Sequence, residues 1–392
     1  MPPMPFTRDG RVLADSTLRQ TVRVTVGGPR IRLRFSNAYG TTDLPLTEVR
    51  VARPEGGLAG VFPIAAGSSR AVTFGGRPGA VIPAGAQVVS DPLDFPLAAG
   101  AVVTVTIYLL AGADVAGGLT SHPGSRTRSY LLAGHLADHY ASRSQPAPVE
   151  HWYLLAGVEV QAGDGACAVI ALGDSLTDGR GSTTDGNDRW PDQFSGRLRS
   201  GGSWPGVPRP VAVVNQGIGG NRVLRDGIGP SALARLDRDV LAVSGARWLV
   251  VFEGVNDIGT TDATAAACEG VAADLVFGYE QIIARARAAG LGVYGATLTP
   301  FGGHELYDDP GGHREAARQA VNEWFRSGTR FDGVVDFDRA VRDPDDPRRL
   351  RPEADSGDHL HLNPVGYRAL ADAVPAGYFG CDEPEERTAR VG

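Results

Sequence analysis

The chain has 392 residues, enough for two or three domains with a substantial core, which excludes a peptide hormone or a small disulfide scaffold. Hydrophobic residues make up 42% and charged residues 21%, which excludes wholesale disorder and a membrane-embedded body. The 38 basic and 45 acidic residues give a net charge of -7, and no basic cluster suits a row of phosphates. We therefore expect no nucleic-acid partner.

The composition also limits the chemistry. The sequence contains no lysine, which excludes Schiff-base catalysis and a P-loop lysine. Cys167, Cys268 and Cys381 lie far apart and form no C-x-x-C pair, which disfavours a zinc ribbon or a disulfide framework. We expect no cofactor and no metal.

The N-terminal residues contain no apolar segment of the kind that a secretory signal needs, because prolines and then Arg8 and Asp9 fill this stretch. As written, the chain is expected to be cytoplasmic, and a secreted protein already trimmed of its leader would look the same. The most apolar run, residues 101–111, is about half the length of a membrane span. No membrane span is expected, and the oligomeric state is left open.

Residues 1–162 are expected to form a β-sandwich domain, jelly-roll-like, because short segments with period-2 alternation follow one another between turn residues. Residues 21–26 and 31–35 flank a glycine pair, which predicts a hairpin. Further strands are predicted over 49–52, 71–74, 87–90, 102–110 and 153–160. This domain is expected either to shape the substrate site or to bind carbohydrate.

Residues 163–381 show a different pattern, in which buried strands alternate with longer amphipathic stretches, and a polar tail follows at 382–392. This alternation is typical of an α/β domain with a parallel sheet between two helical layers. Strands are predicted over 167–172, 211–215, 248–252, 292–298 and 333–337, and the clearest helices over 263–289 and 365–374.

The first predicted strand of this domain runs directly into Gly173-Asp174-Ser175-Leu176. The serine hydroxyl then lies at the carboxyl end of a parallel strand, where open α/β sheets bind ligands. Thr177 stands where the G-x-S-x-G elbow of α/β-hydrolases has its second glycine, so that family is disfavoured. Taken alone, such a serine is more commonly a helix cap.

The next two strands also lead into polar or glycine-rich turns. The strand that ends at Asn215 is followed by a glycine-rich turn containing Gly219 and Gly220. The third strand leads to Asn256 and Asp257, which place an amide and a carboxylate at the strand tip. An ordinary tight turn and a helix cap are the simpler explanations of these two motifs.

Near the end of the sequence, Asp358 and His361 stand three residues apart, so that the carboxylate can orient a histidine base. His359 and His361 also form H-x-H beside two aspartates, which would suit a metal site, although no further ligand cluster accompanies them. Asp355, six residues before His361, is a second candidate for the carboxylate role.

Together these motifs resemble the GDSL, or SGNH, hydrolase family over residues 165–380. The motifs occur in the family's order: Gly173-Asp174-Ser175, then Gly220, then Gly254-x-Asn256-Asp257, and finally Asp358-x-x-His361. The resemblance implies a flavodoxin-like α/β/α domain with carboxylic ester hydrolase activity. The N-terminal region lies outside these motifs, and its pairing with the domain resembles two-domain bacterial esterases of the family.

The resemblance also implies roles for individual residues. Ser175 would be the nucleophile, His361 the general base and acid, and Asp358 the group that orients the imidazole. The oxyanion hole would consist of the Ser175 N–H, the Gly220 N–H and the Asn256 side chain, with Gly219 as a near competitor of Gly220.

The loops 177–188 and 302–313 are polar and poor in large aliphatic residues, which favours a short acyl group such as acetyl on a polar or sugar-like alcohol. Asp174 is expected to hold the nucleophile turn, and it joins Trp190 and Tyr307 as a candidate for substrate binding, the two rings as stacking surfaces. An acyltransferase with the same acyl-enzyme and an inert carbohydrate-binding protein are the alternatives.

Overall fold

The computed structural model describes residues 10–114, 118–139, 146–200, 210–328 and 330–379. The chain divides into two compact units: the first ends at Gly163 and also takes in Thr184–Asn187, and the second comprises Asp164–Thr183 and the chain from Asp188 onward. No helix in these described ranges has the length and apolar character needed to cross a membrane. The predicted polar tail, Cys381 and the first nine residues lie outside the described part of the chain.

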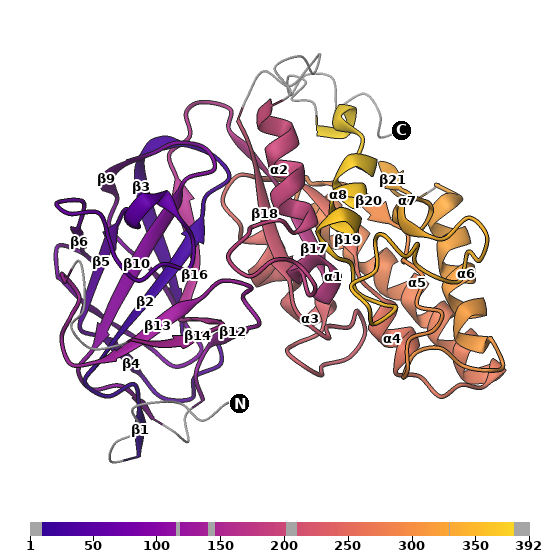
Figure 1. Cartoon of the computed structure of the whole chain (residues 1–392), viewed down its shortest axis with the longest axis horizontal. Helices are drawn as coiled ribbons and strands as arrows, with labels where there is room; N and C mark the ends of the chain where they lie inside the picture. The colour runs from indigo at the N-terminus through magenta and orange to yellow at the C-terminus, as the bar shows by residue number, and fades with distance from the viewer. Residues whose placement is uncertain (1–9, 115–117, 140–145, 201–209, 329, 380–392) are drawn as a thin grey trace. The chain divides into compact units, whose positions relative to one another are not determined.

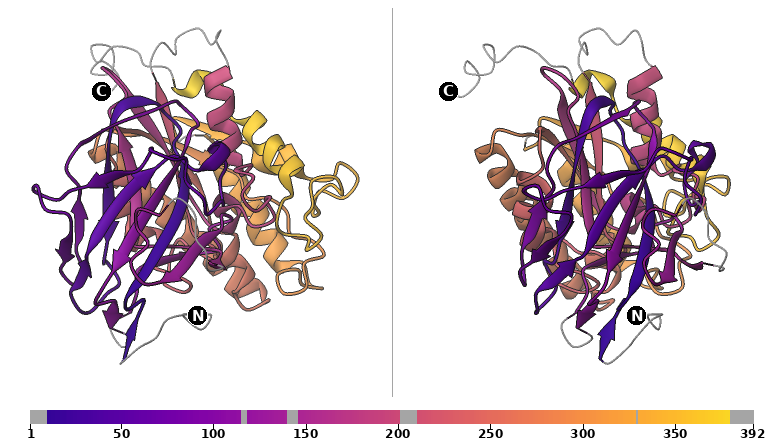
Figure 2. Two further views of the ribbon diagram at one scale, coloured as in Figure 1. Left: turned by 60° about the vertical axis from the view of Figure 1, so that its left-hand side comes forward. Right: turned by 90° about the vertical axis from the view of Figure 1, so that its left-hand side faces the viewer.

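The first unit consists mainly of antiparallel strands, which Figure 2 shows in indigo and purple running alongside one another. The larger sheet has the order β14 (Ala147–Val149), β13 (Ser129–Ala133), β2 (Ser16–Arg23), β10 (Val102–Leu109), β5 (Glu48–Ala52) and β6 (Arg70–Val72). The smaller sheet has the order β16 (Leu155–Val160), β3 (Gly28–Ser36) and β8 (Gln87–Val89), and β9 (Leu93–Leu97) also pairs with β3. Three short ribbons complete it: β1 (Arg11–Val12) with β11 (Ala113–Asp114), β4 (Leu44–Leu46) with β7 (Ala80–Ile82), and β12 (Ser121–Pro123) with β15 (His151–Tyr153).

Both sheets of this unit contribute to one buried apolar cluster. Leu18 and Val105 come from the larger sheet, and Leu33 and Phe35 come from the smaller one; all four are at most 1% exposed. Two sheets that share a core in this way form a sandwich, as the alternating pattern predicts.

The predicted hairpin around Gly27 and Gly28 is wrong. β2 pairs with β10 and β13, whereas β3 pairs with β16, β8 and β9, so the turn carries the chain from one sheet to the other. Gly28 is needed for a close backbone approach, because a Cβ there would lie 2.1 Å from the carbonyl oxygen of Gln161. The predicted strand at 153–160 is also divided, since Leu154, at φ 65°, separates β15 from β16.

The second unit has one parallel sheet in the order β18 (Val211–Gly217), β17 (Cys167–Gly173), β19 (Ala246–Phe252), β20 (Gly292–Ala296) and β21 (Gly333–Val335). The first strand therefore lies between the second and the third, which is the flavodoxin-like order. All residues of β17 and β20 are buried, as expected of parallel strands covered on both faces. Cys167 is one of these buried residues.

Helices cover both faces of the sheet (Figure 1). α2 (Trp190–Ser200) packs against α8 (Pro364–Ala373), while α3 (Ala232–Leu236) and α6 (His313–Arg326) pack against the long α5 (Ala265–Ala288). Three short helices, α1 (Ser175–Asp178), α4 (Val255–Gly259) and α7 (Phe337–Val341), begin close to the ends of strands. The predicted last strand is too long, because Asp336 accepts a hydrogen bond from the Arg339 N–H and so starts α7.

The register of the sheet aligns the carboxyl ends of three neighbouring strands. Gly173, the last residue of β17, is paired with Gly217 of β18 and with Phe252 of β19. The turns that follow these strands contain Ser175, Gly220 and Asn256 respectively. The carboxyl edge of the sheet therefore gathers the motifs that the sequence predicts for the site.

Candidate active site

The turn that presents Ser175 is tightly packed. Asp174 caps α1, and its Oδ1 accepts the Leu176 N–H at 2.9 Å. A Cβ on Gly173 would lie 2.3 Å from Thr177 Oγ1 and 2.5 Å from the Phe252 carbonyl oxygen, so the close approach requires glycine. Ser175 is the first residue of α1, where its side chain is 6% exposed.

Ser175, His361 and Asp358 form a continuous chain of hydrogen bonds. Ser175 Oγ lies 2.8 Å from His361 Nε2, and His361 Nδ1 lies 2.7 Å from Asp358 Oδ2. The His361 backbone N–H also donates to Asp358 Oδ1 at 2.8 Å. The structure therefore brings together the three residues that the motifs single out, in the connectivity that a serine nucleophile and its base require.

The carboxylate of Asp358 is stabilised in its ionised form. Partial burial alone would raise the pKa of Asp358, but hydrogen bonds from the side chain and backbone of His361 outweigh it and hold this pKa well below its ordinary value. An ionised carboxylate at Nδ1 directs the free lone pair of a neutral His361 to Nε2, which faces the serine.

Asp355 belongs to a separate pair. Its Oδ2 lies 2.7 Å from His359 Nδ1, and its Oδ1 accepts the His359 N–H. Asp355 thus orients His359, whose ring is half exposed, while Asp358 orients His361. The two aspartate–histidine pairs explain why the sequence contains an H-x-H motif with two nearby carboxylates.

Asn256 lies on α4, directly after a turn that needs glycine. Gly254 caps α4 at φ 131°, and a Cβ there would meet the Tyr279 hydroxyl at 2.3 Å. The Asn256 carboxamide is 4% exposed, its Nδ2 donates to the Asn221 carbonyl oxygen at 2.8 Å, and its Oδ1 accepts the Tyr307 hydroxyl at 2.6 Å. An amide nitrogen carries two hydrogens, so one N–H remains for a ligand.

The glycine-rich turn after β18 is fixed by the neighbour of Asn256. Asp257 accepts the N–H groups of Val223 and Leu224 at 2.9 and 3.1 Å, which ties this turn to α4. Gly220 adopts φ 72°, where glycine is favoured. Gly219 and Gly220 both belong to the turn, and the choice between their N–H groups stays a prediction.

The three residues predicted to contact substrate have different surroundings. Trp190 is fully buried, packs edge-on against Phe337, and so offers no free face to a sugar; the stacking prediction is wrong for this residue. Asp174 is 1% exposed, burial raises its pKa to about 7, and its Oδ1 accepts the Leu176 N–H within the turn. Tyr307 is half buried, and its hydroxyl is engaged by Asn256 rather than free to solvent.

Two residues that belong to no motif support the site. Arg235 is fully buried and donates to the Gly173 and Gln216 carbonyl oxygens and to Asn221 Oδ1, at 3.0, 2.7 and 2.9 Å. Asn221 follows Gly220 directly, so an extended motif would have included it. No pattern in the sequence marks Arg235, because its partners lie at the end of β17, in β18 and in the turn after β18.

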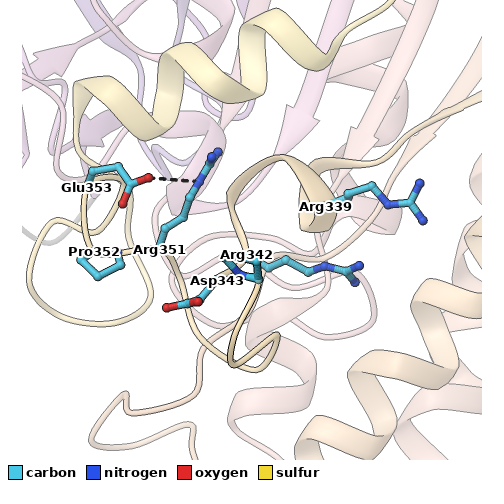
Figure 3. A pocket seen from close by; sticks show the side chains of 7 residues that line it. Arg339, Arg342, Asp343, Arg351, Pro352 and Glu353 are labelled. Carbon is cyan, nitrogen blue, oxygen red and sulfur yellow. Dashed lines mark ion pairs between the residues drawn. The ribbon is translucent and has the colours of Figure 1, made fainter.

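No set of three or more histidine, cysteine, aspartate or glutamate side chains in the described residues is arranged to hold a metal ion. A separate hollow of about 440 Å³ lies in the α7 region and contains none of the predicted site residues (Figure 3). Arg342 donates there to Asp338 at 3.0 Å, and Arg351 lies 3.8 Å from Glu353. The third arginine, Arg339, lies 3.9 Å from Asp336, so each of the three arginines has a carboxylate nearby.

Comparison with known proteins identifies the second unit. The family model of GDSL-like lipases and acylhydrolases matches residues 171–369. No curated protein matches the sequence significantly.

Solved structures with similarity to this chain include a protein of the G-D-S-L family from Desulfitobacterium hafniense, with 17% identity and a TM-score of 0.39, covering 53% of this chain and 96% of that one. The acetylxylan esterase Axe2 from Geobacillus stearothermophilus has 22% identity and a TM-score of 0.38, with 54% and 93% coverage. A GDSL-like lipase from Bacteroides thetaiotaomicron has 15% identity and a TM-score of 0.36, with 53% and 84% coverage.

Proposed function

The chain belongs to the GDSL-like lipase/acylhydrolase family and is a carboxylic ester hydrolase, and we propose that it works through an acyl-enzyme formed on Ser175. The observation that carries this proposal is the hydrogen-bonded chain from Ser175 Oγ through His361 to Asp358, with distances of 2.8 and 2.7 Å. A serine hydroxyl is a weak nucleophile until an oriented base removes its proton.

In the first half of the reaction, Ser175 Oγ attacks the ester carbonyl carbon while its proton passes to His361 Nε2. The carbonyl oxygen becomes an oxyanion, which the N–H groups of Ser175 and Gly220 and the free N–H of Asn256 stabilise. When the tetrahedral intermediate collapses, the C–O bond to the alcohol breaks and His361 gives its proton to the leaving oxygen. The acyl group then remains on Ser175.

In the second half, water takes the place of the alcohol. His361 accepts a proton from the water as it attacks the acyl carbon, and then returns a proton to Ser175 Oγ as the acid leaves. Asp358 stays ionised throughout and stabilises the imidazolium that forms in each half.

For the substrate we propose a short acyl group, such as acetyl, on a polar or sugar-like alcohol. The loops 177–188 and 302–313 are mostly polar. Ile228 lies beside Gly220, where a Cβ on the glycine would meet its side chain at 2.9 Å, and it is 67% exposed. Leu306, which precedes Tyr307, is also exposed, and apolar side chains this scattered suit a short acyl group better than a long one.

The test is hydrolysis of p-nitrophenyl esters from acetate to decanoate by the wild type and by Ser175→Ala. We expect the variant to lose about a millionfold in kcat, or to fall to background. Ser182→Ala, in the loop that follows α1, is the matched control and should retain activity. Equal rates for Ser175→Ala and the wild type would reject Ser175 as nucleophile.

The length of the acyl chain tests the proposed substrate, and the products distinguish hydrolysis from acyl transfer. Activity should be highest with acetate or propionate; a steady rise past about eight carbons would contradict the short acyl site. Product analysis with an added acceptor alcohol separates hydrolysis from acyl transfer, since a transferase would form a new ester at the expense of free acid.

A further inference from the structure

The Asn256 carboxamide is held at both of its polar atoms. Its Nδ2 donates to the carbonyl oxygen of Asn221 at 2.8 Å, and its Oδ1 accepts the Tyr307 hydroxyl at 2.6 Å. With the amide turned over, its oxygen would face the Asn221 carbonyl oxygen, and two acceptors repel each other. The Asn221 carbonyl therefore selects one orientation of the amide, and Tyr307 contacts the opposite end.

We propose that Tyr307 is a positioning residue for ester hydrolysis, whose hydroxyl holds the Asn256 carboxamide with its free N–H directed at the oxyanion that forms on attack by Ser175. The inference rests on the proposed function, because an oxyanion arises only in acyl transfer. A donor at the amide oxygen also draws electron density from the amide nitrogen, which strengthens the remaining N–H as a donor.

The Tyr307 ring is fixed before any substrate binds. It packs so closely on Gly259 that a Cβ there would lie 2.3 Å from the ring, and Phe301 contacts it edge-on with 6.2 Å between ring centroids. His304 Nδ1 accepts the N–H groups of Leu306 and Tyr307 at 3.3 and 3.2 Å, which shapes the turn. A hydroxyl held in place in this way requires no rearrangement during the reaction.

The chemical state of Tyr307 suits a permanent donor. Burial raises the pKa of Tyr307 to about 12, so the hydroxyl keeps its proton over the whole range in which esterases are assayed. Asn256 occupies the polar end of the half-buried ring, and stacking of a substrate on the Tyr307 ring stays a prediction.

The experiment compares Tyr307→Phe with Tyr294→Phe in the full chain. Both hydroxyls donate a 2.6 Å hydrogen bond, but Tyr294 donates to the Tyr378 carbonyl oxygen, away from the site motifs. We expect Tyr307→Phe to lower kcat for p-nitrophenyl acetate about tenfold with KM changed less than twofold, because only the transition state contains the oxyanion. Binding of an alkylboronic acid, which forms a tetrahedral adduct with the serine, should weaken by a similar factor. Tyr294→Phe should change neither quantity.

A double-mutant cycle with Asn256→Ala separates positioning from general packing. If Tyr307 acts through Asn256, Tyr307→Phe has little further effect once the amide is gone. Gly259→Ala is a second variant that retains the hydroxyl but displaces the ring, and it should reproduce the loss in kcat.

The inference is overturned if Tyr307→Phe leaves kcat unchanged, as Tyr294→Phe does. It is also overturned if Tyr307→Phe lowers kcat by the same factor in the wild type and in Asn256→Ala. A wild type that hydrolyses no ester, with Ser175→Ala indistinguishable from it, would instead reject the proposed function and this inference with it. Active wild type with an unaffected Tyr307→Phe would reject the inference alone.

Discussion

The guanidinium of Arg235 donates a hydrogen bond to the carbonyl oxygen of Gly173, 3.0 Å away, from a side chain with no exposed surface. The same group donates to the Gln216 carbonyl oxygen and to Asn221 Oδ1. Gly173 ends β17 and immediately precedes the nucleophile turn, while Asn221 follows Gly220 and accepts the Asn256 amide. One buried cation therefore links the turn of the proposed nucleophile to the turn of the proposed oxyanion hole.

Arg235→Met should destabilise the second unit strongly. The change removes a donor from the Gly173 and Gln216 carbonyl oxygens and from Asn221 Oδ1. The Gly173 oxygen keeps the Ile218 N–H, and each buried group left without a partner costs about 1–3 kcal/mol. We expect the free energy of unfolding to fall by about 3 kcal/mol or more, measured by urea titration of the full chain. Arg339→Met is the matched control, since that side chain is 72% exposed and should change stability by less than about 1 kcal/mol. Equal stability of the two variants would show that Arg235 is not a structural link.

Glu253 makes the stability of the protein depend on pH. Its side chain is fully buried, one of its oxygens has no hydrogen-bond partner, and Arg235 lies 3.5 Å from the other. Burial raises the pKa of Glu253 from 4.5 to about 8, because the Arg235 guanidinium offsets only part of the desolvation and the carboxylates of Asp174 and Asp257 add to the rise. The folded protein therefore retains a proton that the unfolded chain releases at much lower pH.

The free energy of unfolding should consequently fall as pH rises from about 5 to 8, since the unfolded chain binds fewer protons there. Burial raises the pKa of Asp174 to about 7 and that of Asp257 to about 6, and both act in the same direction. In Glu253→Gln the fall in the free energy of unfolding between about pH 5 and 8 should be smaller by up to a few kcal/mol, measured by urea unfolding at each pH. Glu280→Gln, at an exposed carboxylate of α5, should leave this fall unchanged; an equal effect of both variants would contradict the assignment.

Asp358→Asn should lower kcat by about a thousandfold to ten thousandfold, because an amide at Nδ1 favours the wrong tautomer of His361 and cannot stabilise the imidazolium. Asp355→Asn is a closely matched control: the same change removes the charge beside His359, which has no role in the proposed reaction. It should alter kcat less than threefold. Comparable losses in both variants would mean that the second pair also takes part.

The pH profile adds to this prediction. The pKa of Asp358 lies well below its ordinary value, so Asp358 stays ionised above about pH 4. Its protonation then makes no contribution to a loss of activity between about pH 5 and 7 in the wild type, measured as kcat/KM.

Much of the fold could be predicted because the signals are local. β17 is a continuous apolar run that both helical layers bury, so its extent follows from residue type alone. The failed hairpin at Gly27 and Gly28 has the opposite cause. Its turn residues and alternation are those of a hairpin, but the partner of β2 is β10, whose position in the sheet depends on the whole sandwich.

In the candidate site, too, local motifs predict some residues, whereas the contacts of others depend on the tertiary structure. Ser175, Asn256 and His361 follow directly from strand ends or short spacings, and the sheet register brings the first two together. Trp190 has an aromatic ring of the kind that stacks on sugars, yet this ring packs in the core beside Phe337. Tyr307 lies in a loop, and nothing in the sequence indicates that its hydroxyl meets Asn256, because that contact depends on how the loop folds over α4.

Two glycines of α5 test how closely this helix packs on the site. Gly270 is exposed, and no atom lies within 4 Å of the position that a Cβ would take there, so Gly270→Ala should stabilise the protein by about 0.5–1 kcal/mol through helix propensity alone. At Gly278 a Cβ would lie 2.8 Å from Val223 Cγ1 and 3.0 Å from Leu224 Cδ2. Gly278→Ala should instead destabilise the protein by about 1–3 kcal/mol, as overpacking does.

The same pair of variants should differ in activity. Because Asp257 accepts the N–H groups of Val223 and Leu224, displacement of this turn by Gly278→Ala should also lower kcat, whereas Gly270→Ala should leave kcat unchanged. Thermal unfolding and ester hydrolysis of both variants measure the difference, and stabilisation by Gly278→Ala would show that the turn after β18 is loosely packed.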